Sequence, residues 1–174
     1  MSPRSWVAAG LLGAFCALAL PAVHEAGAAP RPTLRADRVL VEKSARRLML
    51  FWQGREVRSY RVALGHAPVG RKQCQGDDRT PEGLYRIDAR NSGSAYHRSL
   101  HVSYPNAGDV ANSRRLGCKP GGDIMIHGIK NGYGWMGSLH AKTDWTLGCI
   151  AVTDQEIEEI WVAVPNGTPV EIRP

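Results

Sequence analysis

From residue 37 onward, apolar and polar residues alternate over short stretches, which is the pattern of half-buried β-strands. Tyr60, Val62 and Leu64 fall on one face of such a stretch, and Leu84 and Ile87 are the inward residues expected of another. The strands that these patterns predict cover residues 39–44, 46–52, 57–65, 84–89, 99–105, 123–129 and 168–172.

One helix is expected, directly after the last internal apolar run. Thr153 and Glu156 form a capping box, in which each side chain accepts a backbone N–H of the other residue. A stripe of apolar residues follows at helical spacing and is assigned to core packing: Ile157, Ile160, Trp161 and Val164. The fold class is therefore mainly β, with one short helix packed across a sheet.

The first residues have the layout of a secretory signal peptide. Arg4 precedes an apolar run over residues 6–20, and a small-residue cleavage site follows at Ala26-Gly27-Ala28. The run is too short for a membrane-spanning helix, so no stable span is expected after cleavage. We expect a signal peptide over 1–28, a short linker over 29–37, one domain over 38–174 and a periplasmic location; an uncleaved anchor is the alternative.

The formal net charge is +6 over 174 residues, and the expected signal peptide removes one base and one acid. In an exported protein, this charge favours polyanionic surroundings such as envelope polymers or phospholipid head groups, although solubility alone explains it equally well. The basic residues are dispersed and are not interleaved with aromatic residues, so nucleic acid is not an expected partner.

Cys149 lies in the segment DWTLGCIAV, residues 144–152. Alone, GCIAV is typical of a buried strand, because free Cys behaves as a small hydrophobic residue. A nucleophilic Cys needs a base, a group that orients the base, and amides that stabilise an oxyanion. His127 is the candidate base: Ile124 and Ile126 of IMIHGI are expected in the core, which turns His127 to the opposite face.

Two glycines adjoin these candidates. Gly128 and Gly148 remove side-chain bulk beside His127 and Cys149, and backbone amides at 148 and 149 could then point at a carbonyl oxygen. A pair of this type can exist as imidazolium and thiolate, which would place the pKa of the Cys well below that of a free thiol.

HG at 127–128 together with TLGCIAV at 146–152 resembles the motifs of the L,D-transpeptidase catalytic domain (YkuD type). The segments GDDRTPEGLYRI, SLHVSYPN, PGGDIMIHG and DWTLGC resemble periplasmic members, so the resemblance extends over residues 38–173. It implies a β-sandwich-like domain with a helix after the catalytic Cys and no metal or organic cofactor. It also implies residue roles: Cys149 as nucleophile, His127 as general acid/base, the Gly128 carbonyl orienting the His, and the amides of Leu147, Gly148 and Cys149 as oxyanion hole.

The implied reaction begins with attack of Cys149 on the third residue of a peptidoglycan stem peptide, with release of D-Ala and formation of a thioester. Transfer to an amine would give a 3-3 cross-link or attach an envelope lipoprotein, and transfer to water would make the enzyme a carboxypeptidase. Leu147 and Ala151 depart from the His and the Arg or Asn of many members. DWT-x-GCIAV is similar to a subgroup that contains an amidase releasing wall-bound lipoprotein, which is the alternative; a non-catalytic wall-binding module ranks lower.

Cys74 and Cys118 lie in loops expected to border the site, Cys74 in a Gly-, Pro- and Asp-rich loop over residues 65–83. In an exported protein a 74–118 disulfide is the pairing that leaves Cys149 free, against two free thiols or a Cys118–Cys149 redox lock. Candidate substrate-binding residues are Trp135, Asp144, Trp145 and Thr146. No metal site is expected, because His97 and His101 would lie about 13 Å apart on a strand.

Overall fold

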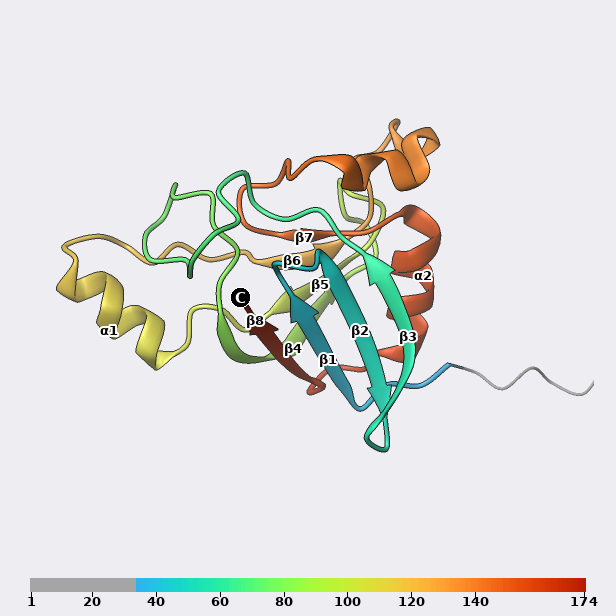
Figure 1. Ribbon diagram of the computed structural model, residues 1–174, viewed down its shortest axis with the longest axis horizontal. Coiled ribbons are helices and arrows are strands. Elements are labelled where there is room, and N and C mark those ends of the chain that lie inside the picture. Colours follow the sequence, from blue (N-terminus) through green and yellow to red (C-terminus); the bar gives the residue numbers. More distant parts are fainter. Residues whose placement is uncertain (1–33) are drawn as a thin grey trace, which may run out of the picture. The chain divides into compact units, whose positions relative to one another are not determined.

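The computed structural model describes residues 34–174, so the expected signal peptide lies outside the described residues (Figure 1). The elements are the strands β1 (Arg38–Glu42), β2 (Arg47–Trp52), β3 (Arg55–Arg61), β4 (Gly83–Asn91), β5 (Ser99–Val102), β6 (Met125–His127), β7 (Ile150–Ala151) and β8 (Pro169–Arg173), the α-helices α1 (Ala107–Arg115) and α2 (Asp154–Ala163), and the 3-10 helix η1 (Gly134–Lys142).

The strands form one eight-stranded sheet in the order β3-β2-β1-β8-β4-β5-β6-β7. β4 joins its two halves: the first residues of β4 pair with β8, the last pair with β5, and the register shifts between Ile87 and Ala89. Beyond β3, Ala63 pairs with Ala151 of β7 and Gly65 pairs with Thr146. The sheet therefore curls until its two ends meet, which confirms the mainly β prediction.

The interior of this curled sheet is apolar. Tyr60, Val62 and Leu64 are all buried, as their shared face predicts. The prediction for Leu84 is wrong: its side chain is 72% exposed, whereas Tyr85 is 6% exposed. Side chains alternate along a strand, so Tyr85 and Ile87 point inward together and Leu84 points to solvent.

α2 begins as its sequence predicts. Thr153 and Glu156 accept each other's backbone N–H at 3.2 Å and 2.8 Å, and Ile157 and Ile160 are fully buried. The helix contacts β5 and β6 and so supports the strand that carries His127.

The sequence patterns do not predict the second α-helix, α1. Its buried residues are Asp109 and Ser113, so no apolar stripe marks it. Asn106 caps it through a capping box with Asp109, whose carboxylate also accepts bonds from Tyr85 Oη at 3.0 Å and Arg71 at 2.9 Å. Polar contacts thus hold this helix in place.

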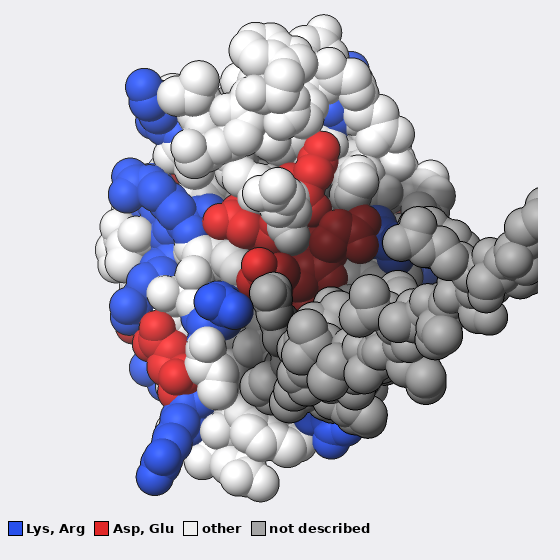
Figure 2. Space-filling view, turned by 90° about the vertical axis from the view of Figure 1, so that its right-hand side faces the viewer, with Lys and Arg blue, Asp and Glu red and all other residues white. Residues whose placement is uncertain are grey.

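Charges of both signs share the face shown in Figure 2, where acidic side chains gather near the centre and Lys and Arg lie along one flank. α2 runs along this side of the molecule, and its Glu158 and Glu159 pair with Arg98 and Arg58. The positive charge is therefore not concentrated here. Among residues 34–174, no helix is long and apolar enough to cross a membrane.

Candidate active site

Cys149 lies immediately before β7, beside β6. The register pairs Ile126 with Ile150, which places Cys149 next to Met125. The Met125 N–H donates to Sγ at 3.4 Å, and the thiol donates to the Asp123 carbonyl at 3.5 Å. Cys149 is half-buried and is a free cysteine.

A tight turn presents this thiol. Thr146 Oγ1 donates to the Cys149 carbonyl at 2.8 Å and accepts the Gly148 N–H at 3.1 Å. Gly148 has φ +129°, and a Cβ there would lie 2.7 Å from the Arg79 carbonyl oxygen, so only glycine fits without movement of the backbone.

The same turn bears on the expected oxyanion hole. The Gly148 N–H already donates to Thr146 Oγ1 within the turn. The backbone amides of Leu147 and Cys149 remain as candidates, and both residues line the cleft described below.

His127 lies at the end of β6 and is 4% exposed. Its Nδ1 is 2.6 Å from the Gly128 carbonyl oxygen. Because a carbonyl only accepts, Nδ1 carries the proton, which leaves the lone pair on Nε2. The ring lies 4.6 Å from the Tyr96 ring and 5.8 Å from the Trp145 ring, measured between centroids, so two aromatic side chains flank it.

Burial keeps both reacting groups uncharged. It lowers the pKa of His127 to about 4, against a smaller opposing effect of the bond to Gly128. Burial also raises the pKa of the Cys149 thiol, and the Asp123 carboxylate adds to this, while the Met125 N–H and Lys72 oppose it. In this state the pKa shifts therefore favour neutral imidazole and thiol over the expected imidazolium–thiolate pair.

A cleft of about 640 Å³ contains both candidates. Segments 72–78, 91–99, 121–127 and 145–149 line it, so residues far apart in sequence form its walls. Among the described residues no hydrogen bond joins the thiol to the imidazole, since Sγ donates to Asp123 instead.

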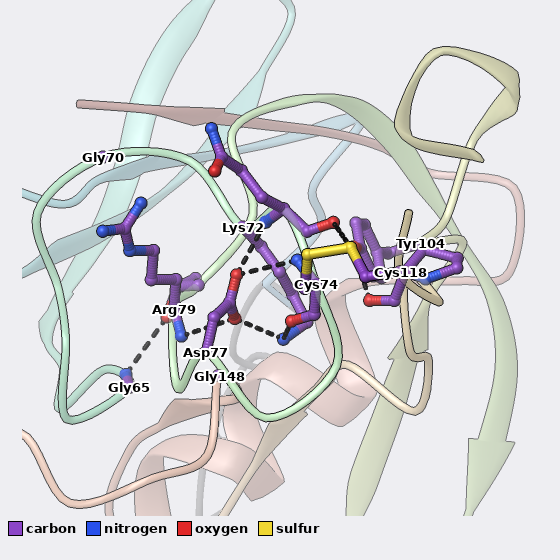
Figure 3. Close-up of polar contacts among 12 residues, drawn as sticks. Gly65, Gly70, Lys72, Cys74, Asp77, Arg79, Tyr104, Cys118 and Gly148 are labelled. Carbon is purple, nitrogen blue, oxygen red and sulfur yellow. Dashed lines mark hydrogen bonds and ion pairs between the residues drawn. A yellow bond between two sulfur atoms is a disulfide. The ribbon is translucent and has the colours of Figure 1, made fainter. Parts of the chain in front are cut away.

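Two walls of the cleft are joined covalently. Cys74 and Cys118 form a disulfide with a Cα–Cα distance of 5.7 Å, and the Gln75 N–H donates to the Lys119 carbonyl at 2.7 Å beside it. Asp77 organises the first wall (Figure 3): its carboxylate accepts bonds from Lys72 Nζ at 2.7 Å and from three backbone N–H groups, those of Gln73, Cys74 and Arg79.

This wall packs closely on the Cys149 turn. A Cβ on Gly65 would lie 2.1 Å from the Asp78 carbonyl oxygen, and Gly148 meets the Arg79 carbonyl as described above. Buried Lys43 holds the loop from the other side, with Nζ bonded to the carbonyls of Gly70 and Thr80 and to Glu82. The loop over 65–83 is thus fixed against the turn that presents the thiol.

The four candidate substrate-binding residues separate into two groups. Trp145 and Thr146 line the cleft, whereas Trp135 is 78% exposed and does not line it, so its assignment to substrate binding stays a prediction. Asp144 does not line the cleft either: its carboxylate bonds Arg46 at 2.7 Å and accepts the Leu64 N–H at 2.9 Å, which is a structural role.

Sequence reasoning missed Tyr96, which stacks beside His127, and Asp78 and Asp123, which line the cleft. Asp123 lies two residues before β6, the strand of His127, so its proximity could have been inferred. Tyr96 carries no such signal, because it lies in the loop between β4 and β5 and meets His127 only through strand pairing.

Within residues 34–174, no group of three or more His, Cys, Asp or Glu side chains is placed to hold a metal ion. His97 lies 2.8 Å from Glu158 and His101 lies 2.5 Å from Asp88, so each contacts a separate carboxylate.

Comparison with known proteins identifies the family of this chain. Residues 36–172 match the family model described as YkuD, L,D-transpeptidase catalytic domain. A relative from Escherichia coli (strain K12), named "Putative L,D-transpeptidase YafK", is 32% identical over 106 residues, which cover 59% of this chain and 35% of that protein. The chain thus spans about a third of the length of this curated relative.

Solved structures share the fold. The helical cell shape determining protein Pgp2 from Campylobacter jejuni matches with a TM-score of 0.61 and 26% identity over 78% of this chain and 46% of that one. An L,D-transpeptidase from Xylanimonas cellulosilytica matches with a TM-score of 0.53 and 18% identity over 83% and 63% of the two chains. The chain belongs to the family of YkuD L,D-transpeptidase catalytic domains.

Proposed function

We propose that this protein is an exported, periplasmic cysteine acyltransferase of peptidoglycan, with Cys149 as nucleophile and His127 as general acid/base. The observation that carries the proposal is the free Cys149 and the buried His127 in one cleft, with Nδ1 of the His fixed by the Gly128 carbonyl. The donor substrate is a stem peptide that ends in D-Ala.

In the first step, Nε2 of neutral His127 removes the thiol proton as Sγ attacks the carbonyl of the third stem residue. The amides of Leu147 and Cys149 stabilise the oxyanion. The imidazolium then returns the proton to the leaving D-Ala amine, and the C–N bond breaks to give a thioester. An amine attacks this thioester, His127 accepts its proton, and the thiol re-forms.

The acceptor decides the overall reaction. An amine of a second stem gives a 3-3 cross-link, and a Lys of an envelope lipoprotein gives an attached lipoprotein. The similarity of DWT-x-GCIAV to a subgroup containing an amidase favours release of wall-bound lipoprotein as a second candidate. Both reactions use the same thioester.

The test is mass spectrometry of muropeptides incubated with the protein purified after export. The pool contains tetrapeptide stems and stems that bear a lipoprotein Lys-Arg remnant. Loss of D-Ala, with or without 3-3 dimers, supports transpeptidase or carboxypeptidase activity, and removal of the remnant supports the amidase. Cys149→Ala should abolish either activity. If the wild type changes neither substrate, a wall-binding role replaces the proposal.

A further inference from the structure

The peptide group between Gly128 and Ile129 has a hydrogen bond on each side. Its carbonyl accepts from Nδ1 of His127 at 2.6 Å. Its N–H donates to Oδ1 of Asp154 at 2.8 Å. A trans peptide group is planar, and its C=O and N–H point in opposite directions. The imidazole and the carboxylate therefore lie on opposite sides of one rigid group, and a chain of two hydrogen bonds connects them.

The backbone leaves room for the Asp154 carboxylate at this place. A Cβ on Gly128 would lie 2.8 Å from Oδ1, and a Cβ on Gly134 would lie 2.3 Å from Oδ2. Both distances are too short for a real side chain, so a larger residue at either position would displace the carboxylate or the backbone. Two glycines thus bracket the carboxylate, one directly after His127 and the other at the start of η1.

Asp154 is the first residue of α2, and this end of the helix is tied to β6. The capping box of Thr153 and Glu156 fixes the first turn. The Val152 N–H donates to the His127 carbonyl at 2.9 Å, two residues before Asp154. The helix dipole also favours a negative charge in the first turn. The carboxylate therefore reaches the peptide group from a helix whose start is itself held by hydrogen bonds.

We propose that Asp154 is a positioning residue for His127: through the Gly128–Ile129 peptide group, its carboxylate holds the imidazole in place and strengthens the acceptor of the Nδ1 proton. The inference rests on the proposed function, in which His127 is the general acid/base. A charged acceptor on the N–H polarises the peptide group, and hydrogen bonds in such a chain strengthen one another. The carbonyl that faces Nδ1 then carries more negative charge than it would beside a neutral acceptor.

This charge acts on the reaction when His127 becomes protonated. In the proposed first step, Nε2 takes the thiol proton of Cys149 and the ring becomes an imidazolium. Burial opposes this cation, and the bond to the Gly128 carbonyl favours it. In a Ser-His-Asp triad a carboxylate stabilises the imidazolium directly. Here the peptide group stands between the two, and Asp154 acts through it.

The test separates the charge of Asp154 from its role as a hydrogen-bond acceptor. Asp154→Asn keeps an oxygen that can accept the Ile129 N–H but removes the charge, whereas Asp154→Ala removes both. Glu156→Gln is the matched control, because it removes a carboxylate from the same helical turn and keeps the capping box. Burial lowers the pKa of His140, and Glu156 and Asp154 both oppose this, so the control also accounts for that effect. Urea unfolding checks that each variant folds.

Two readouts are compared in the protein purified after export. NMR of the 15N-labelled imidazole, assigned by its loss in His127→Gln, reports the Nδ1 proton at neutral pH. D-Ala release from a stem tetrapeptide gives kcat and KM separately.

In Asp154→Asn the Nδ1 proton should move upfield, because its hydrogen bond is weaker. kcat should fall about fivefold to tenfold, which is the difference between a charged and a neutral acceptor. KM should stay unchanged, since the imidazolium forms only during the reaction. Asp154→Ala should lose at least as much in kcat and should also lose stability. Glu156→Gln should match the wild type in kcat, KM and the Nδ1 shift.

Wild-type kcat and an unshifted Nδ1 proton in Asp154→Asn would overturn the inference, because the carboxylate charge would then have no effect on His127. Equal losses in Asp154→Asn and Glu156→Gln would overturn it as well, because the effect would not depend on the link through the peptide group. The NMR readout needs no substrate, so absence of turnover by the wild type would count against the proposed function alone.

Discussion

At the scale of single residues, the environment of each group determines its chemistry. His127 is enclosed by Tyr96, Trp145 and the sheet, and only Nδ1 has a hydrogen-bond partner in the described chain. Burial keeps the ring neutral, and the bond at Nδ1 leaves Nε2 as the unprotonated nitrogen in the cleft. In the proposed reaction, a neutral base beside a protonated thiol means that proton transfer accompanies attack on the substrate.

This burial predicts a pH dependence of stability. The unfolded His has a pKa of 6.5 and the folded His127 about 4. Between these values the unfolded chain binds a proton that the folded protein does not, so the free energy of unfolding decreases as the pH falls from 6.5 to 4. The loss from this residue is on the order of 3 kcal/mol.

Urea unfolding at several pH values measures the effect, with His127→Gln as the comparison. The variant should lose less stability between pH 7 and pH 4.5 than the wild type. Parallel pH profiles of the two proteins would show that His127 is not the group responsible.

At the scale of elements, the two α-helices are stabilised differently. α2 buries an apolar stripe against the sheet, which is the pattern that sequence reading detects. α1 buries Asp109, whose carboxylate caps the helix and bonds Tyr85 and Arg71 from elsewhere in the chain. Because these partners lie more than twenty residues away, no local pattern reveals them.

The two capping boxes therefore predict unequal effects of substitution. Asp109→Ala should lower the free energy of unfolding by about 2 to 3 kcal/mol, because it removes a cap and a buried partner of Tyr85. Glu156→Ala removes a cap alone and should cost about 1 kcal/mol. Urea unfolding of both variants measures the difference, and equal losses would contradict the tertiary role of Asp109.

At the scale of the whole molecule, the cleft is an assembly of four segments. The disulfide between Cys74 and Cys118 spans 44 residues of sequence and joins two of its walls, one of which packs on the Cys149 turn. Stability and the geometry of the site are consequently linked through this bond.

Removal of the disulfide should lower both the stability of the fold and the activity of the site. A chain-entropy estimate for a loop of this length is about 4 kcal/mol, and Cys74→Ser with Cys118→Ser should approach that loss of unfolding free energy. D-Ala release should fall as well, because the two walls are no longer joined. Cys149→Ala is the control that should lose activity while retaining most of the stability. Full activity in the double Ser variant would exclude a role of the disulfide in shaping the cleft.

The sequence by itself determined what local patterns encode. Strand alternation predicted the mainly β fold, the capping box at Thr153 predicted α2, and the HG and TLGCIAV motifs predicted the family. These features depend on residues close in sequence, whose preferences act before the chain folds.

The tertiary structure decided the rest. It paired β6 with β7, which placed Cys149 and His127 in one cleft, and it buried them enough to keep both neutral. It also brought Tyr96 to the His and Asp154 to the peptide group whose carbonyl bonds the ring. Burial and electrostatic environment are set by long-range packing, and for this reason no local pattern in the chain could predict them.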